Sequence, residues 1–239
     1  MGEEIGSQEI VLPFWDSLSE GMLFFELQAL EDSVLFGFHY STKDAPVRRV
    51  CLGLVITHFN RPQEVEKTAL RFKKELLQGP YYEGKIQLII VDNSRNLPRS
   101  LADEKGIAVI PNRNLGGSGG FSRGLIHLHH AGDFTHGLFM DDDASSEIES
   151  IRRTFFYLTY THEPKLAIAG AMLRAVQPNM QHENGGRFDG LCYPIKCYYN
   201  LLLTRDLLRN EQEEPIDYGA WWYFAFPLQA VKHLSLIHI

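Results

Sequence analysis

From Val50 onward, continuous apolar runs alternate with stretches of helical periodicity. The runs 50–57, 86–91 and 107–110 are typical of strands buried on both faces of a parallel sheet. Between the first two runs, apolar residues recur at helical spacing, at Val65, Ala69, Phe72 and Leu76. A further helix is expected over about 121–130, before an apolar strand over 137–140. The alternation predicts an α/β fold, a Rossmann-like and mostly parallel sheet with helices on both sides.

Residues 1–46 have a different texture. Short apolar or alternating stretches at 9–12, 23–27 and 33–40 are separated by turn residues and predict β-strands. About 45 residues cannot close a sandwich around a core of their own. We therefore expect residues 1–46 to be the last strands of a β-sandwich domain with its linker, and residues 47–239 to be the α/β domain.

Composition narrows the class of protein. The chain has 239 residues, is 44% hydrophobic and carries a net charge of −7, which suits a globular domain and argues against a nucleic-acid partner. Its three cysteines form no C-x-x-C pair, so we expect neither zinc nor disulfides. No apolar stretch is long enough to span a bilayer, and no signal-peptide pattern is present. The expected location is the cytoplasm, with any membrane association peripheral, at the inner face of the plasma membrane.

The triple aspartate Asp141-Asp142-Asp143 directly follows the apolar run 137–140. Carboxylates this close raise one another's pKa unless a cation neutralises them. Ligands of open α/β sheets bind beyond the carboxyl ends of strands, where Mg²⁺ or Mn²⁺ takes carboxylate and phosphate oxygens together. The motif therefore indicates a metal–diphosphate clamp. The alternative is a solvated loop that caps the next helix through Ser146 and Glu149.

Two further polar segments, 57–61 and 92–94, follow strands and should reach the same sheet edge. Asp92 is suited to accept hydrogen bonds from a base or ribose, and Arg61 to pair with phosphate or base oxygens. The alternatives are a turn-forming aspartate and a solvated arginine. Their convergence with the aspartates favours a nucleotide site.

The segment 112–123 has four glycines in five positions, Gly116 to Gly120, before a predicted helix. Glycine lets a backbone approach a ligand closely, and a helix N-terminus attracts anions. The alternative is a flexible linker. The nearby His127, His129 and His130 match no metal motif and are expected to be surface or packing residues.

Two later motifs suit a sugar. Glu183 lies in a polar loop and could accept hydrogen bonds from hydroxyl groups, although an ordinary loop carboxylate is an equal alternative. The adjacent Trp221 and Trp222 could form a platform for a sugar ring. Their alternative is a core strand with one indole on each face.

Taken in order, the motifs at 55–62, 91–93, 112–123, 140–143 and 221–222 resemble those of inverting family-2 glycosyltransferases. The likeness is closest to the bacterial galactofuranosyltransferases that use UDP-galactofuranose. The resemblance implies a GT-A domain preceded by a β-sandwich. It also implies metal-dependent transfer of a sugar, galactofuranose as the best guess, to a glycan or lipid-linked glycan acceptor during cell-surface polysaccharide synthesis. Homo-oligomerisation is a further expectation.

The resemblance also implies residue roles. The nucleotide sugar would be held by Thr57, Phe59, Arg61, Asp92, Asn114, Gly117, Asp141 and Asp142. The sugar and acceptor would meet Glu183, Trp221 and Trp222. Mn²⁺ or Mg²⁺ would be held by Asp141 and Asp143.

The end of the chain departs from the family. The aspartate that serves those enzymes as general base, some two dozen residues after the tryptophan pair, has no counterpart before Ile239, and residues 235–239 do not resemble the family's continuation. We expect a chain truncated at both ends, with its general base beyond the C-terminus and no transfer activity of its own. The alternatives are a dTDP-rhamnose rhamnosyltransferase, a nucleotidyltransferase, and a non-catalytic nucleotide- or carbohydrate-binding fragment.

Overall fold

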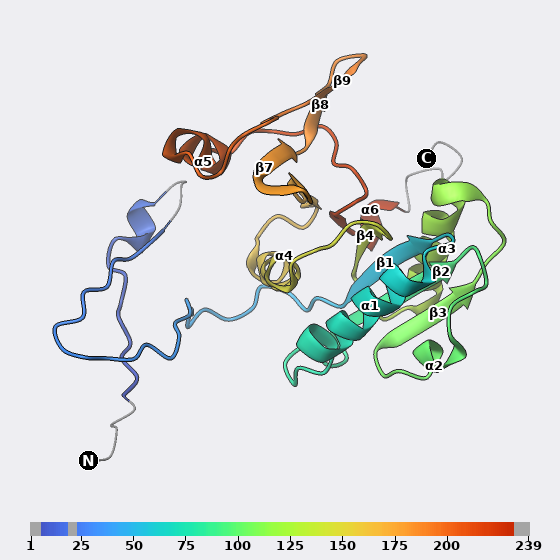
Figure 1. Cartoon of the computed structure of the whole chain (residues 1–239), viewed down its shortest axis with the longest axis horizontal. Helices are drawn as coiled ribbons and strands as arrows, with labels where there is room; N and C mark the ends of the chain where they lie inside the picture. The colour runs from blue at the N-terminus through green and yellow to red at the C-terminus, as the bar shows by residue number, and fades with distance from the viewer. Residues whose placement is uncertain (1–5, 19–22, 232–239) are drawn as a thin grey trace.

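The computed structural model describes residues 6–18 and 23–231 (Figure 1). Its centre is a six-stranded sheet in the order β3-β2-β1-β4-β10-β5. The strands β1 (Leu52–His58), β2 (Ile86–Asp92), β3 (Ile107–Pro111) and β4 (His136–Asp141) are parallel. β10 (Phe224–Pro227) runs antiparallel to both β4 and β5 (Ile168–Ala169). The predicted α/β class with a mostly parallel sheet is confirmed.

Helices cover both faces of this sheet, because successive strand residues point to opposite sides. On one face, Leu54 and Ile56 pack with α1 (Pro62–Phe72), its π-helical extension η2 (Lys73–Leu77) and α4 (Ile148–Tyr160). On the other face, Val55 packs with α3 (Gly116–Ala131). Figure 1 shows α1 and α3 on either side of the strands, and the short α2 (Arg99–Ala102) precedes β3. The apolar runs read from the sequence are therefore buried from two sides.

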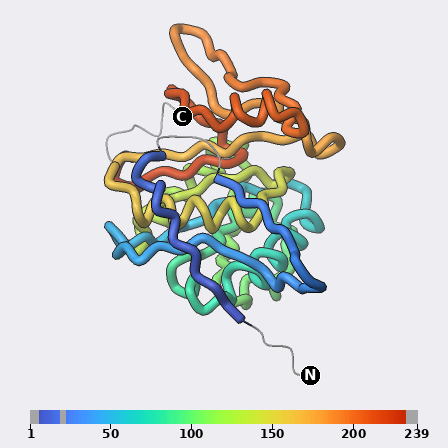
Figure 2. The backbone as a smooth tube through the Cα atoms, turned by 90° about the vertical axis from the view of Figure 1, so that its left-hand side faces the viewer, coloured from blue at the N-terminus to red at the C-terminus, as the bar shows by residue number. Residues whose placement is uncertain are grey.

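A smaller lobe lies beyond one end of the sheet, as Figure 2 shows in orange and red. It contains the pairs β6 (Met172–Arg174) with β7 (Gln177–Glu183) and β8 (Gly186–Phe188) with β9 (Cys192–Pro194), followed by α5 (Thr204–Glu211). After β10 comes the short α6 (Leu228–Val231). No helix of the described residues is long and apolar enough to cross a membrane.

The strands expected at 9–12, 23–27 and 33–40 are not formed in the described part of the N-terminal segment. Its regular structure there is the 3-10 turn η1 (Trp15–Ser17), and Figure 1 shows it apart from the sheet. The reason is that a strand needs a hydrogen-bonding neighbour, and a lone hairpin is marginal in water.

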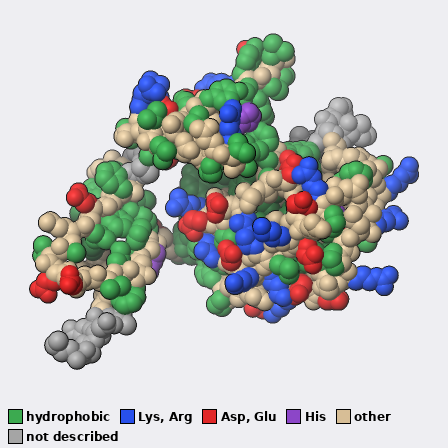
Figure 3. Space-filling view, viewed as in Figure 1, with side chains coloured by type: hydrophobic (Ala, Val, Ile, Leu, Met, Phe, Trp, Pro, Cys, Tyr) green, Lys and Arg blue, Asp and Glu red, His purple; other side chains and the backbone are tan. Residues whose placement is uncertain are grey.

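Side-chain contacts nevertheless retain an antiparallel arrangement in this segment. The rings of Phe25 and Phe38 lie 4.4 Å apart, and the Tyr40 hydroxyl donates to the Leu23 carbonyl over 3.5 Å. Most apolar side chains here remain exposed, as the green surface in Figure 3 shows. The assignment of residues 1–46 to a β-sandwich stays a prediction.

Candidate functional site

The ends of β1, β2 and β4 bring the three predicted polar segments together. Thr57 pairs with Asp141 across one side of β1, and His58 pairs with Asp92 across the other. Backbone groups then bind the neighbouring segments, since the Phe59 N–H donates to Asp142 Oδ2 over 3.1 Å. The structure thus assembles segments from three parts of the sequence at one sheet edge.

The aspartate loop, residues 141–143, holds three carboxylates whose negative charges repel one another. Burial raises the pKa of Asp141, and the charges of Asp143 and Asp142 raise this pKa further. Arg61 pairs with this loop: its Nη1 lies 3.1 Å from Asp143 Oδ2, and its Nε lies 3.9 Å from Asp142 Oδ1. Because Arg61 and Asp143 are about half exposed, this pairing is a weak compensation.

The helix-capping alternative for this loop is not observed. The residue before α4, Glu147, makes no side-chain capping hydrogen bond. The Ser146 hydroxyl instead points at Met140 Sδ, 3.4 Å away, and Glu149 pairs with Arg153 one turn along the helix. The acidic loop therefore has no structural role as a cap.

The carboxylates fit a metal only in part. In the described residues, no three side chains of His, Cys, Asp or Glu converge as a metal site. Asp142 is turned toward the Phe59 N–H and Asp143 toward Arg61. Mg²⁺ commonly binds through one or two carboxylates plus substrate phosphates. The arrangement suits a cation that arrives with a diphosphate and not one held by protein ligands alone.

His58, which the sequence analysis did not single out, lies between the two acidic segments and is fully buried. Its Nε2 lies 2.9 Å from Asn96 Oδ1, and its Nδ1 lies 3.6 Å from Asp142 Oδ2. That Nδ1 has no hydrogen-bond partner among the described residues. The sequence signal that could have identified His58 is its place at the end of a buried strand, next to Phe59. Its position links the Asp92 loop, residues 92–97, with the aspartate loop.

The Asp92 carboxylate binds backbone N–H groups of the loop that follows it. Its Oδ1 accepts hydrogen bonds from the N–H groups of Ser94 and Arg95, and its Oδ2 accepts one from Leu97. The side chain is 4% exposed. This is the turn-forming alternative, so a nucleoside would have to share these oxygens. The contact between Asp92 and a nucleoside stays a prediction.

The glycine-rich segment is helical, which excludes the flexible-linker alternative. α3 begins at Gly116, five residues before the predicted start, and Asn114 Oδ1 accepts from the Gly116 N–H over 3.0 Å. The early start is explained by packing: Gly120 lies against Thr57 and Gly124 against Val55, where a Cβ would overlap. Gly117 by contrast has open space around it. The glycines therefore divide into packing positions and an exposed turn.

The two indoles do not share a surface. Trp221 packs edge-on against Phe121 and Phe139, whereas Trp222 packs on the opposite core and its Nε1 lies 3.4 Å from the Gly170 carbonyl. This is the alternative of one indole on each face. Both remain partly exposed just before β10, at the same sheet edge as Asp141.

Glu183 lies at the end of β7 in the smaller lobe, half-buried, where its charge raises the pKa of Cys197 after the larger effect of burial. Within the described ranges, no hydrogen bond joins Glu183 to the aspartate loop. His127, His129 and His130 lie on α3 and belong to no metal-binding group of the described residues. The ligand contacts of Glu183, Trp221 and Trp222 stay predictions.

Two galactofuranosyltransferases are similar to most of this chain. No protein-family profile matches the chain. The chain is 29% identical over 251 residues to galactofuranosyltransferase GlfT2 of Mycobacterium tuberculosis, covering 95% of this chain and 38% of that protein. It is 27% identical over 221 residues to GlfT2 of Mycolicibacterium smegmatis, covering 82% of this chain and 33% of that protein. The resemblance to family-2 GT-A glycosyltransferases is confirmed. The chain spans less than two fifths of the length of these relatives.

The names of these two relatives agree with the predicted enzyme class, a glycosyltransferase. Among solved structures, the chain is similar to the mannosyltransferase PcManGT from Pyrobaculum calidifontis in complex with GDP-Man and Mn²⁺. That match has a TM-score of 0.48 at 11% identity and covers 81% of this chain and 49% of that chain. A second similar structure is S. aureus TarS, with a TM-score of 0.44 at 14% identity over 77% of this chain and 48% of that chain.

Proposed function

We propose that this chain is the donor-binding part of a transferase that moves galactofuranose from UDP-galactofuranose to a growing cell-surface glycan. The observation that carries the proposal is the meeting of the segments 59–61, 92–97 and 141–143 at one sheet edge. Support for the sugar comes from the similarity to two galactofuranosyltransferases. The acceptor would be a glycan or lipid-linked glycan, which suits a protein acting at the inner face of the plasma membrane.

The diphosphate of the donor would lie between Arg61 and the open turn at Gly117. A helix N-terminus offers free N–H groups and a positive dipole end to such an anion. Exchange of Arg61 from Asp143 to the diphosphate would free that carboxylate. Uridine would contact Thr57, Phe59, Asn114 and the Asp92 loop.

Asp141 and Asp143 would hold Mn²⁺ or Mg²⁺ jointly with diphosphate oxygens. When bound, the cation would neutralise charge on the departing UDP. It would also relieve the repulsion that raises the pKa of Asp141. Asp142, held by the Phe59 N–H, would keep the loop in place. Glu183, Trp221 and Trp222 would contact the sugar and acceptor.

Calorimetric titration of UDP, with and without Mn²⁺, tests this proposal. We expect metal to tighten UDP binding, and Asp143→Ala to weaken metal-dependent binding at least about tenfold, as for loss of a metal ligand. The matched control is Asp103→Ala, at an exposed aspartate after α2 that forms no ion pair with a described residue; this variant should bind as the unmodified chain does. UDP affinity that does not depend on metal, or that is unchanged in Asp143→Ala, would contradict the proposed metal–diphosphate clamp.

The donor is tested by competition. UDP-galactofuranose should displace bound UDP at lower concentration than dTDP-rhamnose does. A preference for dTDP-rhamnose would make the galactofuranosyl assignment wrong while leaving the clamp intact. The two parts of the proposal therefore fail separately.

A further inference from the structure

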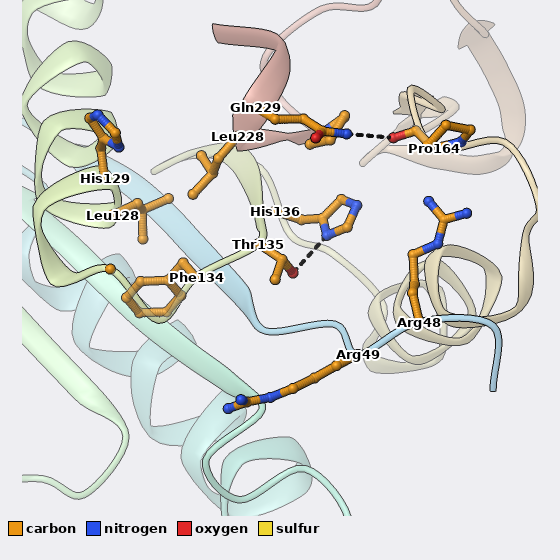
Figure 4. A pocket seen from close by; sticks show the side chains of 12 residues that line it. Arg48, Arg49, Leu128, His129, Phe134, Thr135, His136, Pro164, Leu228 and Gln229 are labelled. Atoms are coloured by element: carbon orange, nitrogen blue, oxygen red, sulfur yellow. Dashed lines mark hydrogen bonds between the residues drawn. The ribbon is translucent and has the colours of Figure 1, made fainter. Parts of the chain in front are cut away.

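A cavity lies at the amino-terminal ends of the parallel strands, opposite the carboxyl-terminal ends that carry the aspartate loop. Its volume is about 470 Å³, and Figure 4 shows the side chains that line it. Arg48 and Arg49 enter it just before β1, and Thr135 and His136 enter it at the start of β4. Since a strand rises about 3.3 Å per residue, the length of β4 separates this cavity from Asp141 by roughly 17 Å. It is a separate place from the candidate donor site.

The charge of this cavity is unlike that of the whole chain. Its described lining includes Arg48, Arg49, His129 and His136, and no aspartate or glutamate. The chain as a whole carries a net charge of −7. Two permanently charged guanidinium groups at one hollow without a facing carboxylate favour an anionic ligand.

Backbone carbonyl groups just after the C-terminus of α4 hold the Arg48 side chain in place. Its Nη2 donates to the Thr161 carbonyl over 2.6 Å, and its Nη1 donates to the Glu163 carbonyl over 3.2 Å. Neutral carbonyl groups fix the guanidinium without cancelling its charge. A guanidinium has five N–H donors, so further donors remain for a ligand. The group is thus pre-organised for a charge-assisted contact.

His136 supplies a second polar atom. The residue is only 5% exposed, and its Nδ1 lies 2.8 Å from Thr135 Oγ1. Its Nε2 makes no hydrogen bond to any described residue, and Figure 4 shows the ring lining the hollow beside Arg48. Burial, and then the charge of Arg48, lower the pKa of His136 to about 4, so the ring is neutral near pH 7. The residue is therefore nearly buried, while Nε2 is open to the hollow and free to bind a polar ligand there.

The chemistry of the two groups selects among anions. Nε2 of a neutral histidine is a donor in one tautomer and an acceptor in the other. A hydrogen phosphate or phosphate monoester carries both oxyanion acceptors and a hydroxyl donor when singly protonated. It can therefore satisfy Nε2 in either tautomer while its charge faces Arg48.

We propose that this cavity binds a phosphate group, free or as a monoester, between Arg48 and His136. The site is independent of the proposed donor site. Inorganic phosphate is the probe, titrated into the full chain in phosphate-free buffer and followed by calorimetry and by NMR. Saturable binding should persist with UDP at saturation, because the two sites lie at opposite edges of the sheet.

Two variants test the assignment. Arg48→Met should weaken phosphate binding at least about tenfold, equivalent to 1.4 kcal/mol. His136→Gln should weaken it severalfold and keeps the proposal testable where Arg48→Met does not fold. The control is Lys67→Met on α1, an exposed position that removes the same charge and should bind as the unmodified chain. Circular dichroism and thermal melting establish that each variant is folded.

The source of the phosphate group is separated by vesicles that contain phosphatidic acid. Binding of free phosphate without co-sedimentation assigns a soluble ligand, and co-sedimentation lost in Arg48→Met assigns a lipid headgroup. The proposal is overturned by any of three results. These are no saturable binding of either probe, equal binding by both variants and the control, or displacement of phosphate by UDP.

Discussion

Replacement of Gly120 by alanine tests whether the glycines of α3 serve packing or ligand. Gly120 is buried against β1, where an added Cβ would overlap Thr57 Cγ2 and lie 2.8 Å from Thr57 Oγ1. Rotation about χ1 of Thr57 gives no relief, because two heavy atoms share three positions and one of the two blocked positions is always filled. Asn93 Nδ2, 3.1 Å from the added atom, closes the other side.

The size of the effect follows from two opposing contributions. Overpacking costs about 1–3 kcal/mol, and an added Cβ only 2.2 Å from Thr57 Cγ2 places this contact in the upper part of that range, at about 2–3 kcal/mol. Alanine in place of glycine regains about 1 kcal/mol of helix propensity. We therefore expect Gly120→Ala to lower the free energy of unfolding by about 1–2 kcal/mol. For a domain of this length, that change lowers the melting temperature by about 2–8 °C.

Gly117→Ala is the matched variant on the same helix. No atom lies within 4 Å of its added Cβ and its φ is not positive, so stability should stay the same or rise slightly. UDP affinity should instead fall about tenfold, or 1.4 kcal/mol, because the methyl group occupies the space proposed for the diphosphate. Thermal melting and UDP titration measure both variants. A Gly120→Ala protein that melts at or above the unmodified temperature refutes the packing argument, and Gly117→Ala with unchanged UDP affinity refutes the ligand argument.

Three further predictions concern other parts of the chain. His58→Phe should cost about 0.5–1.5 kcal/mol in urea unfolding because it removes the hydrogen bond to Asn96 Oδ1, and His58→Gln should recover part of this; equal stability of the phenylalanine variant would contradict the bridging role. Between about pH 6.5 and pH 4, stability should fall as pH falls, because unfolded His136 takes up a proton that the folded protein excludes. His136→Phe should remove up to about 3 kcal/mol of that dependence, and an unchanged slope would show that another group titrates. Limited proteolysis should cut within residues 41–49 and leave 50–231 intact, whereas resistance across that junction would indicate a docked N-terminal segment.

Much of the fold follows from local pattern. The continuous apolar runs 50–57 and 86–91 identified buried parallel strands, because only strands covered on both faces lack alternation. Carboxyl ends of such strands share one edge, so the meeting of the Asp92 loop with the aspartate loop could be predicted without coordinates. The start of α3 could not, because a run of glycines is helical here only through its close packing on Thr57 and Val55.

The sequence by itself determined which segments form the sheet and which acidic and glycine-rich motifs end at its edge, because hydrophobic period and strand direction are properties of local sequence. Only the tertiary structure decided the partner of each side chain. It paired Arg61 with Asp143, set His58 between two loops, and placed Trp221 and Trp222 on opposite faces. It also left the strands expected before residue 46 unformed and brought Arg48 beside His136. The physical reason is that these contacts join residues far apart in the chain, whose distance depends on packing and not on local pattern.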